Sequence, residues 1–250
     1  MDSGLYAAYT GLMARTQALD TTANNLSNVS TNGYRAQRDF FAHFMPLDSN
    51  TPAESQVGDA VNGFSVLGGN TLDLSQGQLV STGNPLDVAL RGTGFFAVKT
   101  PGGVRYTRNG SFELSNRGQL QTMAGYPVLD AALKPIVLPA GEITISRSGQ
   151  ISVQTGDGNG IAGQLGVFDF GNPAALQAEG ADLVSAGAEA KRTASAAETI
   201  QGSIEQSNQD AIHGSMELVL EQRQAEMMQK ALSVFNNDLD KTASEELSRV

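Results

Sequence analysis

The chain has 250 residues and a formal net charge of −10, and it contains no cysteine. This length allows one or two domains with a buried core. The lack of cysteine excludes disulfides, thiolate metal sites and thiol nucleophiles. The acidity lies in residues 151–250, which hold six Lys/Arg and fifteen Asp/Glu. Such a balance disfavours binding to a nucleic-acid backbone, which calls for clustered cations.

The beginning of the sequence lacks the features of a cleaved signal peptide. Its first basic residue is Arg15, so the positively charged n-region of such a peptide is missing. The sequence also has no uninterrupted apolar run of about eighteen residues, the length that a membrane span requires. We therefore expect no membrane span, and a route of export other than a cleaved signal peptide if the protein leaves the cytoplasm.

The first predicted element is a helix in which leucine recurs every seven residues. These leucines are Leu5, Leu12, Leu19 and Leu26. A strict seven-residue period gives the narrow apolar edge of a coiled-coil helix. Gly4 and Gly11 interrupt it, and a glycine in a helix interior costs roughly 1 kcal/mol relative to alanine. We expect this helix to depend on packing partners.

An asparagine-rich junction follows the helix. Its residues are Asn24, Asn25, Asn28, Asn32 and Gly33. Side-chain amides can satisfy backbone groups at a helix end, and asparagine and glycine tolerate the left-handed conformation found there. The sequence predicts that the helix stops at Asn32-Gly33. Amides beyond those that a single cap needs are also suited to contacts between subunits, because asparagine both donates and accepts hydrogen bonds.

The middle of the chain alternates apolar and polar residues with a period of two, which predicts short strands. The inward positions are Leu86, Val88, Leu90, Phe96, Val98, Val104, Tyr106, Phe112, Leu114, Ile143, Ile145, Ile151, Val153, Leu165 and Val167. Turn sequences separate them, including Thr100-Pro101-Gly102-Gly103 and Asn109-Gly110. Strands at this spacing indicate an all-β domain built from hairpins.

The last predicted element is a longer amphipathic helix. Its apolar edge follows the same spacing of seven, divided into three and four, at Leu218, Ala225, Met228, Leu232, Phe235 and Leu239. The fold class is therefore α+β, with a discontinuous terminal α-helical coiled-coil domain and a central all-β domain. The expected boundaries are 1–45 for the first helix and its junction, 46–70 for a linker, 71–185 for the β domain, 186–203 for a second linker and 204–250 for the last helix.

The sequence offers no convincing catalytic, cofactor or metal site. The two histidines, His43 and His213, lie near the helix ends, and each is better explained as a surface or packing residue. Asp157-Gly158-Asn159-Gly160 lacks the further ligands of a calcium loop and predicts a turn. Arg91-Gly92-Thr93-Gly94 lacks the third glycine and the helix of a phosphate loop. We predict that the protein is not an enzyme and needs no cofactor.

Three stretches of the sequence resemble bacterial flagellar rod and hook proteins. They are ANNLSNVSTNGYRAQ at 23–37, LDVALRGTGFFAVKTPGGVRYTRNGSFELSNRGQLQTMAGYPVL at 86–129, and EQSNQDAIHGSMELVLEQRQAEMMQKALSVFNNDLDK at 205–241. They cover both ends and much of the middle, in the family's order. The length of the chain and the segments TPGGVRYTRNG, GYPVL and KPIVLP resemble the proximal rod proteins most, with the distal rod proteins second. Gln209-Asp210-Ala211 departs from the family pattern after Ser207-Asn208.

The resemblance implies a structural subunit that assembles helically with copies of itself and with other rod and hook-junction proteins. Members of the family are exported unfolded through the flagellar type III export apparatus without a cleaved signal. They form the rod of the basal body in the periplasm, a shaft that carries motor torque to the hook. The terminal helices would pack inside this shaft, with the β domains outside.

The residues expected at assembly contacts belong to the two ends of the chain. They are Leu5, Leu12, Leu19, Asn24, Asn25, Leu26, Asn28, Asn32, Gly33, Ser207, Asn208, Leu218, Ala225, Met228, Leu232, Phe235 and Leu239. Three alternatives remain open at this point: a distal rod subunit, a hook-associated or tip-associated flagellar protein, and a ligand-binding β module.

Overall fold

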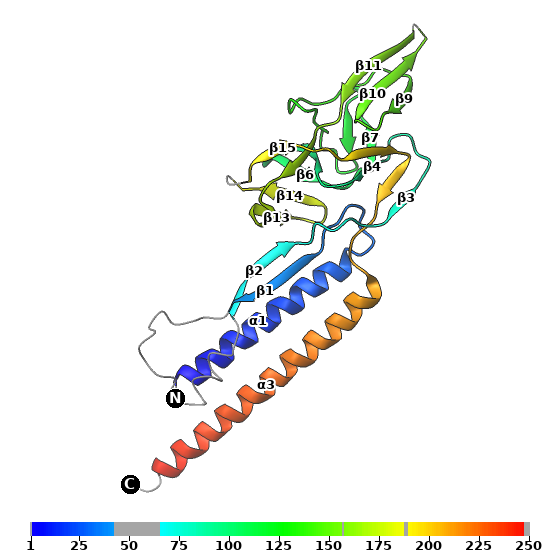
Figure 1. Ribbon diagram of the computed structural model, residues 1–250. Coiled ribbons are helices and arrows are strands. Elements are labelled where there is room, and N and C mark those ends of the chain that lie inside the picture. The colour runs from blue at the N-terminus through cyan, green and yellow to red at the C-terminus, as the bar shows by residue number, and fades with distance from the viewer. Residues whose placement is uncertain (1, 43–65, 157, 188–189, 248–250) are drawn as a thin grey trace. The chain divides into compact units, whose positions relative to one another are not determined.

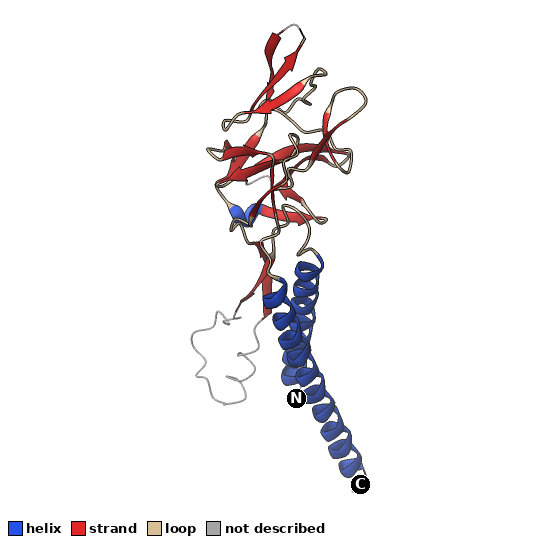
Figure 2. Cartoon of the chain, turned by 90° about the vertical axis from the view of Figure 1, so that its right-hand side faces the viewer, coloured by secondary structure: helices blue, strands red, loops and turns tan. Residues whose placement is uncertain are grey.

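The structure is a computed structural model that describes residues 2–42, 66–156, 158–187 and 190–247. It shows one helix at each end of the chain and a β-rich part between them (Figure 1; Figure 2). The chain divides into two compact units. Unit 1 comprises residues 1–26, 38–70 and 211–250, and unit 2 comprises residues 27–37 and 71–210. The predicted combination of terminal helices and central strands is confirmed, whereas the coiled coil stays a prediction.

Unit 1 is built on two helices that run in opposite directions, side by side (Figure 1). They are α1, Asp2–Ser27, and α3, Ala211–Leu247. An ion pair joins them, with Arg15 Nη1 3.6 Å from Glu221 Oε2. Neither helix, over its described residues, is long and apolar enough to cross a membrane.

Small and polar side chains form the most buried line of α1. They are Gly11, Ala14, Ala18, Thr22 and Asn25. The predicted leucine edge lies beside this line, where Leu12, Leu19 and Leu26 are half-buried. Because glycine and alanine have little or no side chain, this line allows a neighbouring element to approach the α1 backbone closely. Gly11, which costs helix stability on its own, therefore has a packing role.

Two strands accompany the helices in unit 1. They are β1, Gln37–Ala42, and β2, Val66–Leu72, which form a two-stranded sheet. Thr21 of α1 donates a hydrogen bond from Oγ1 to Asp39 Oδ1 at 3.2 Å, and partial burial raises the pKa of the Asp39 carboxyl. The sequence predicts helix and junction over 1–45 and a linker over 46–70, so these strands are additional. Residues 43–65, which include His43 and most of that linker, lie outside the described residues.

Unit 2 consists of short antiparallel strands arranged in several sheets. The largest sheet has the order β13-β14-β6-β5-β12-β15, and a second has the order β11-β10-β9. The strand pairs β4–β16, β3–β17 and β7–β8 complete the unit. The strands are β3 Leu79–Ser81, β4 Val88–Arg91, β5 Phe95–Thr100, β6 Gly103–Thr107, β7 Phe112–Leu114, β8 Leu120–Thr122, β9 Glu142–Ile145, β10 Gln150–Thr155, β11 Gly158–Gln164, β12 Val167–Phe170, β13 Leu176–Glu179, β14 Leu183–Ala186, β15 Arg192–Ala194, β16 Glu198–Gln201 and β17 Ser203–Glu205.

Strand β5 lies between two hydrophobic clusters, so both of its faces are buried. Phe96 and Val98 belong to one cluster, and Phe95 and Ala97 to the other. Since successive side chains of a strand point to opposite faces, the continuous apolar run is what such a central strand requires. The predicted hairpin across Thr100–Gly103 is present, with Phe96 opposite Thr107. β9 and β10 are also antiparallel neighbours, with Ile145 opposite Ile151.

Residues 186–203 differ from the predicted linker, because they contain strands. β15 pairs with β12, and β16 pairs with β4, placing Thr199 opposite Leu90. Both partners lie outside the segment, with Phe168 26 residues before Ala194 and Leu90 109 residues before Thr199, so the local composition of alanine, serine and threonine does not reveal them. Helix α1 also ends earlier than predicted, at Ser27, and turns lead from there to Gly33.

Candidate functional site

The asparagine-rich junction and the segment before α3 meet within unit 2. Gly33 N donates to the backbone oxygen of Glu205 at 2.7 Å, and Asn208 N donates to the backbone oxygen of Tyr34 at 3.4 Å. Asn32 Nδ2 donates to Ser111 Oγ at 3.3 Å. The two quoted end stretches of the sequence therefore lie beside each other, although about 170 residues separate them. We call residues 27–37 and 203–210 together the junction.

Gly33 is the position where the junction most requires glycine. Its φ is +71°, in the left-handed region that favours glycine. A Cβ at this position would also collide with the backbone nitrogen of Asn109, from the loop after β6. The predicted conformational role of Gly33 is thus present, but it serves a turn beyond the helix and a close approach to the β strands.

Asn208 joins three segments of unit 2 through its side-chain amide. Its Oδ1 accepts a hydrogen bond from Ala36 N at 2.8 Å. Its Nδ2 donates to the backbone oxygen of Asp73 at 2.8 Å and approaches Ser75 O and Ser75 Oγ, each at 3.2 Å. An amide can accept and donate hydrogen bonds at the same time because it carries an acceptor oxygen and two donor hydrogens. This explains why asparagine, rather than aspartate, occupies the position.

A buried group of three charged residues lies next to these contacts. Arg35 Nη2 is 2.5 Å from Glu205 Oε1, and Arg108 Nη1 is 3.0 Å from Glu205 Oε2. Glu205 is fully buried, and the side chains of Arg35 and Arg108 are 2% and 3% exposed. Each arginine binds a different carboxylate oxygen, so one glutamate holds two segments that are distant in the sequence. We call these three residues the charged triad.

Further contacts fix the charged triad. Gly77 N donates to Glu205 Oε1 at 2.9 Å, and Arg108 Nη2 donates to the backbone oxygen of Gly92 at 2.6 Å. The Arg108 guanidinium also lies 5.4 Å from the centre of the Phe95 ring, a cation–π distance. Burial lowers the pKa of Arg108, while the carboxylate of Glu205 acts in the opposite direction. Such charges are stable in a protein interior only when they are paired and hydrogen-bonded.

The predicted assembly residues fall into both units. Asn28, Asn32, Gly33, Ser207 and Asn208 belong to the junction in unit 2. Leu12, Leu19, Asn24, Asn25, Leu26, Leu218, Ala225, Met228 and Leu232 belong to the helices of unit 1. Asn24 is exposed and donates to the backbone oxygen of Asp20, whereas Asn25 is buried. The side chains of Leu5, Phe235 and Leu239 lie outside the described side chains.

The inner line of α3 follows the predicted spacing of three and four residues. Ala225 and Leu232 are buried, and Leu218 and Met228 are half-buried. Gly214 and Glu221 occupy the remaining places of this line. A second apolar row is exposed in the single chain. It consists of Ile212, Met216, Val219, Leu220, Met227 and Val234.

The charged triad is the part of the site that sequence reasoning missed. All three residues stand within the quoted stretches, at YRA, YTRNG and EQSN. One signal was available: in Ser203–Glu205 the strand alternation that buries Ser203 also places Glu205 inward. A charged residue at an inward position calls for a partner of opposite charge.

The described residues hold no group of three or more His, Cys, Asp or Glu side chains that could bind a metal ion. His213 is exposed at the beginning of α3. The junction is therefore an arrangement of hydrogen bonds and buried ion pairs that joins chain segments, with no nucleophile and base side by side among its residues.

Comparison with known proteins places the chain in a family. Residues 5–35 match the family described as "Flagella basal body rod protein", and residues 89–153 match "Flagellar hook protein FlgE/F/G D1 domain". The flagellar basal-body rod protein FlgG of Borreliella burgdorferi is 32% identical over 262 aligned positions, covering 96% of this chain and 97% of that protein.

Two relatives named FlgF are similar to the same extent. The flagellar basal-body rod protein FlgF of Rhizobium meliloti is 32% identical over 246 positions, covering 96% of each chain. The FlgF protein of Escherichia coli is 33% identical over 248 positions, covering 93% of this chain and 95% of that protein. The chain therefore belongs to the family of flagellar basal-body rod proteins, which are structural proteins of the basal body and not enzymes.

Proposed function

We propose that the chain is a subunit of the flagellar rod that packs its terminal helices against those of its neighbours to form a helical, torque-transmitting shaft. The observation that carries this proposal is the second apolar row of α3. Leu220, Met227 and Val234 are spaced by seven and are 55%, 63% and 57% exposed in the single chain. Exposed apolar residues at a heptad spacing are typical of a helix that joins a larger bundle.

The inner line of α3 supports the same coiled-coil packing. With Leu218, Ala225 and Leu232 turned inward and Leu220, Met227 and Val234 turned outward, α3 has two apolar seams. One seam is suited to α1 of the same subunit and the other to helices of neighbouring subunits. The predicted assembly residues Leu12, Leu19 and Leu26 of α1 would complete the bundle.

Within the rod we propose the proximal position and a FlgF-type rather than a FlgG-type subunit. The length of the alignments favours this choice. The two FlgF relatives align over 246 and 248 positions, close to the 250 residues of the chain, whereas the FlgG relative requires 262. The distal position remains the second candidate, since the identity to FlgG is as high.

The remaining parts of the proposal concern export and location. We propose that the chain passes through the flagellar type III export apparatus without a cleaved signal and functions in the periplasmic part of the basal body. Helices that gain much of their stability from neighbours are suited to a chain that crosses a narrow channel before it folds. The partners are other rod and hook-junction proteins and copies of the chain.

Deleting the gene tests the function, and locating the protein in isolated basal bodies tests the position. A rod subunit's loss stops the assembly of hook and filament, and the wild-type chain restores them. A strain that lacks the chain but still builds hooks would contradict the rod assignment and favour a tip-associated protein. An epitope label at the hook end of the rod would favour the distal position. A ligand-binding β module would instead be indicated by a small molecule that raises the melting temperature of the purified chain.

A further inference from the structure

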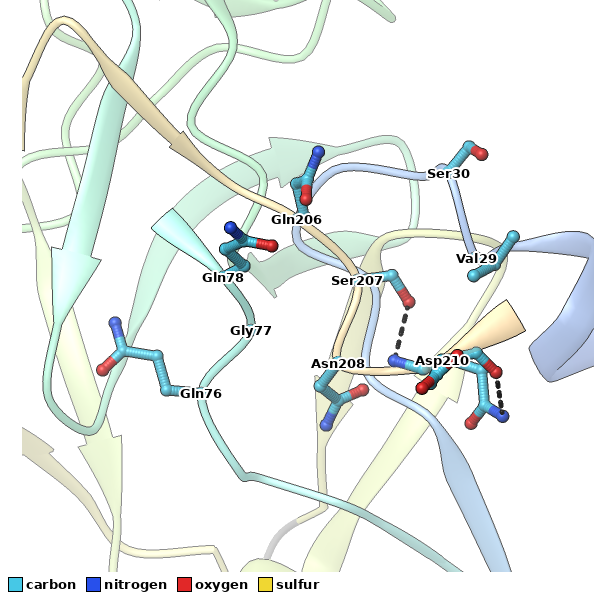
Figure 3. A pocket seen from close by; sticks show the side chains of 10 residues that line it. Val29, Ser30, Gln76, Gly77, Gln78, Gln206, Ser207, Asn208 and Asp210 are labelled. Carbon is cyan, nitrogen blue, oxygen red and sulfur yellow. Dashed lines mark hydrogen bonds between the residues drawn. The ribbon is translucent and has the colours of Figure 1, made fainter. Parts of the chain in front are cut away.

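The junction borders a pocket of about 480 Å³ whose lining is almost entirely uncharged and polar. Figure 3 shows that three segments of unit 2 contribute to it. The lining residues are Val29, Ser30, Gln76, Gly77, Gln78, Gln206, Ser207, Asn208, Gln209 and Asp210. We propose that this pocket receives an uncharged polar peptide segment of a second copy of the chain. The inference rests on the proposed rod function and names a contact surface that lies apart from the helices.

Part of the pocket lining is not engaged in contacts within the chain. The side chains of Ser30, Gln78 and Gln206 are exposed and make no hydrogen bond with any residue that the structure describes. An amide and a hydroxyl offer both donors and acceptors, so these side chains can pair with a peptide backbone or with the polar side chains of a partner. Serine and amide side chains provide adaptable hydrogen bonding at protein interfaces.

The wall of the pocket behind these side chains is held in place by hydrogen bonds. Gly77 N donates to the carboxylate of Glu205, and Gln206 N donates to the backbone oxygen of Gln78 at 2.9 Å. The side chain of Gln76 is fixed by two hydrogen bonds. Its Nε2 donates to Leu90 O at 2.6 Å, and its Oε1 accepts from Gly92 N at 3.3 Å. The charged triad thus supports one side of the pocket. A preorganised wall lowers the ordering cost of binding.

The composition of the lining indicates the class of ligand. Pockets for small molecules are usually lined mainly by hydrophobic and aromatic side chains, whereas this pocket has no aromatic residue and one aliphatic side chain, Val29. The lining contains a single charged residue, Asp210, so a strongly charged ligand finds no set of counter-charges. A neutral polar peptide is the ligand that this set of groups can satisfy.

The net charge of the chain favours a second copy as the source of that peptide. The chain carries a formal net charge of −10, so copies repel each other wherever acidic surfaces meet. A contact between surfaces with few charges reduces that repulsion, and Asp210 is the one charged residue in the lining of this hydrogen-bonding pocket. The exposed turn at residues 81–85, Ser-Thr-Gly-Asn-Pro, shows that the chain itself presents neutral polar segments of this kind.

The test places a photo-crosslinking benzophenone amino acid at Gln78 of the full chain, in cells whose own copy of the gene is deleted. Basal bodies are isolated after irradiation, and the adduct is identified by mass spectrometry. The expected adduct is a peptide from a second copy of the chain. An adduct with a different protein or with a glycan, or no adduct in assembled basal bodies, would overturn the proposal.

Charge substitution provides an independent measurement. Gln78→Glu and Gln206→Glu, made singly, each bring a carboxylate into a polar contact that holds only one charged residue. Gln150→Glu is the matched control, because Gln150 is exposed on β10, away from the pocket, and lies opposite the uncharged Gln164. We expect each pocket variant to lower the fraction incorporated into basal bodies by roughly tenfold, the scale of one charged group left unpaired at an interface. The control should incorporate like wild type, and all three should keep the wild-type melting temperature.

The outcomes separate this proposal from the rod function. If the wild-type chain restores motility to the deletion strain and the pocket variants incorporate as well as the control, the pocket contact is refuted and the rod function stands. If the wild-type chain itself does not restore motility, the rod function fails first. If a pocket variant has a lower melting temperature than the wild type, its incorporation does not test the contact. The crosslinking experiment then decides, because it keeps the wild-type residues at the other lining positions.

Discussion

Glu205 shows how one side chain can join parts of the chain that are distant in the sequence. Its carboxylate accepts from Arg35, Arg108 and Gly77, and its backbone oxygen accepts from Gly33. The segment after α1, the loop after β6 and the segment before α3 therefore share one buried anion. Because two guanidinium groups surround a single carboxylate, neither arginine has another carboxylate to replace it within the triad.

The substitution Glu205→Gln should destabilise the chain strongly. The amide keeps the shape of the carboxylate but leaves two buried arginines without a counter-charge and turns an NH₂ group toward one of them. Breaking a buried ion pair in this way costs about 3 to 5 kcal/mol. Urea unfolding of the purified chain, followed by far-UV circular dichroism, measures the change in unfolding free energy.

Glu179→Gln is the matched control. Glu179 pairs with Arg105, but its side chain is 49% exposed, and exposed ion pairs contribute about 0 to 1 kcal/mol. Equal effects of the two substitutions would show that burial does not set the strength of the charged triad.

A pair of glycines allows the close contact at Gly33 to be separated from its backbone conformation. Gly33 and Gly83 have nearly the same φ, +71° and +75°, but a Cβ at Gly83 would meet nothing within 4 Å. Gly83→Ala should therefore show only the cost of the left-handed conformation, roughly 1 to 2 kcal/mol. Gly33→Ala should cost about 1 to 3 kcal/mol more, because the Asn109 backbone must move. Thermal and urea unfolding of both variants measure the difference, and equal losses would contradict the close contact.

At the scale of elements, the sequence predicted best what depends on local pattern. The apolar residues of β5 and β6 and the turn at Thr100–Gly103 predict a hairpin from the local sequence alone, although β5 is buried on both faces. The seven-residue spacing likewise identified α3 and its inner line through Ala225 and Leu232. In each case neighbours in the sequence are also neighbours in the fold.

The elements that sequence reasoning missed depend on partners far along the chain. β16 and β17 pair with β4 and β3, more than 100 residues earlier. β16 lies in the predicted linker, 186–203, and β17 lies across its boundary with the predicted last helix, 204–250. The same distance hides the contacts of Glu205 with Arg35 and Arg108, which periodicity does not report. For α1 the missed feature is the choice of face, since the leucine period marks an edge that is half-buried while Ala14 and Ala18 are the buried positions.

The second apolar row of α3, called the outer row here because it is exposed, can be tested by placing a charge in it. Met227→Asp places a charge in the middle of the exposed apolar row, where the single chain gives it full access to water. We expect the purified monomer to keep its melting temperature and helix content, while incorporation into basal bodies falls by at least about tenfold, since a carboxylate must be desolvated in a helix bundle. Gln229→Asp, at an exposed polar position two residues away, is the control. Incorporation of both variants at the wild-type level would mean that the outer row stays in water in the rod.

At the scale of the whole molecule, charge and assembly oppose each other. The chain has 26 acidic and 16 basic residues, so each subunit that joins an array of copies meets the negative field of the others. This charge keeps the free subunit soluble. The second apolar row of α3 consists of uncharged side chains, and the pocket at the junction has one charged residue, Asp210. We therefore expect the repulsion to oppose contacts least at these two surfaces.

The balance between these forces predicts a salt dependence of the opposite sign to that of an assembly held by ion pairs. Raising the ionic strength from about 0.02 to 0.5 M shortens the Debye length from about 20 to about 4 Å, which screens the repulsion between subunits. It leaves burial of the outer row of α3 largely unchanged. Self-association of the purified chain should therefore strengthen with added sodium chloride, as measured by sedimentation velocity over a range of protein concentrations. Met227→Asp should remove most of the association at every salt concentration, and an association that weakens as salt is added would instead indicate complementary charges across the contact.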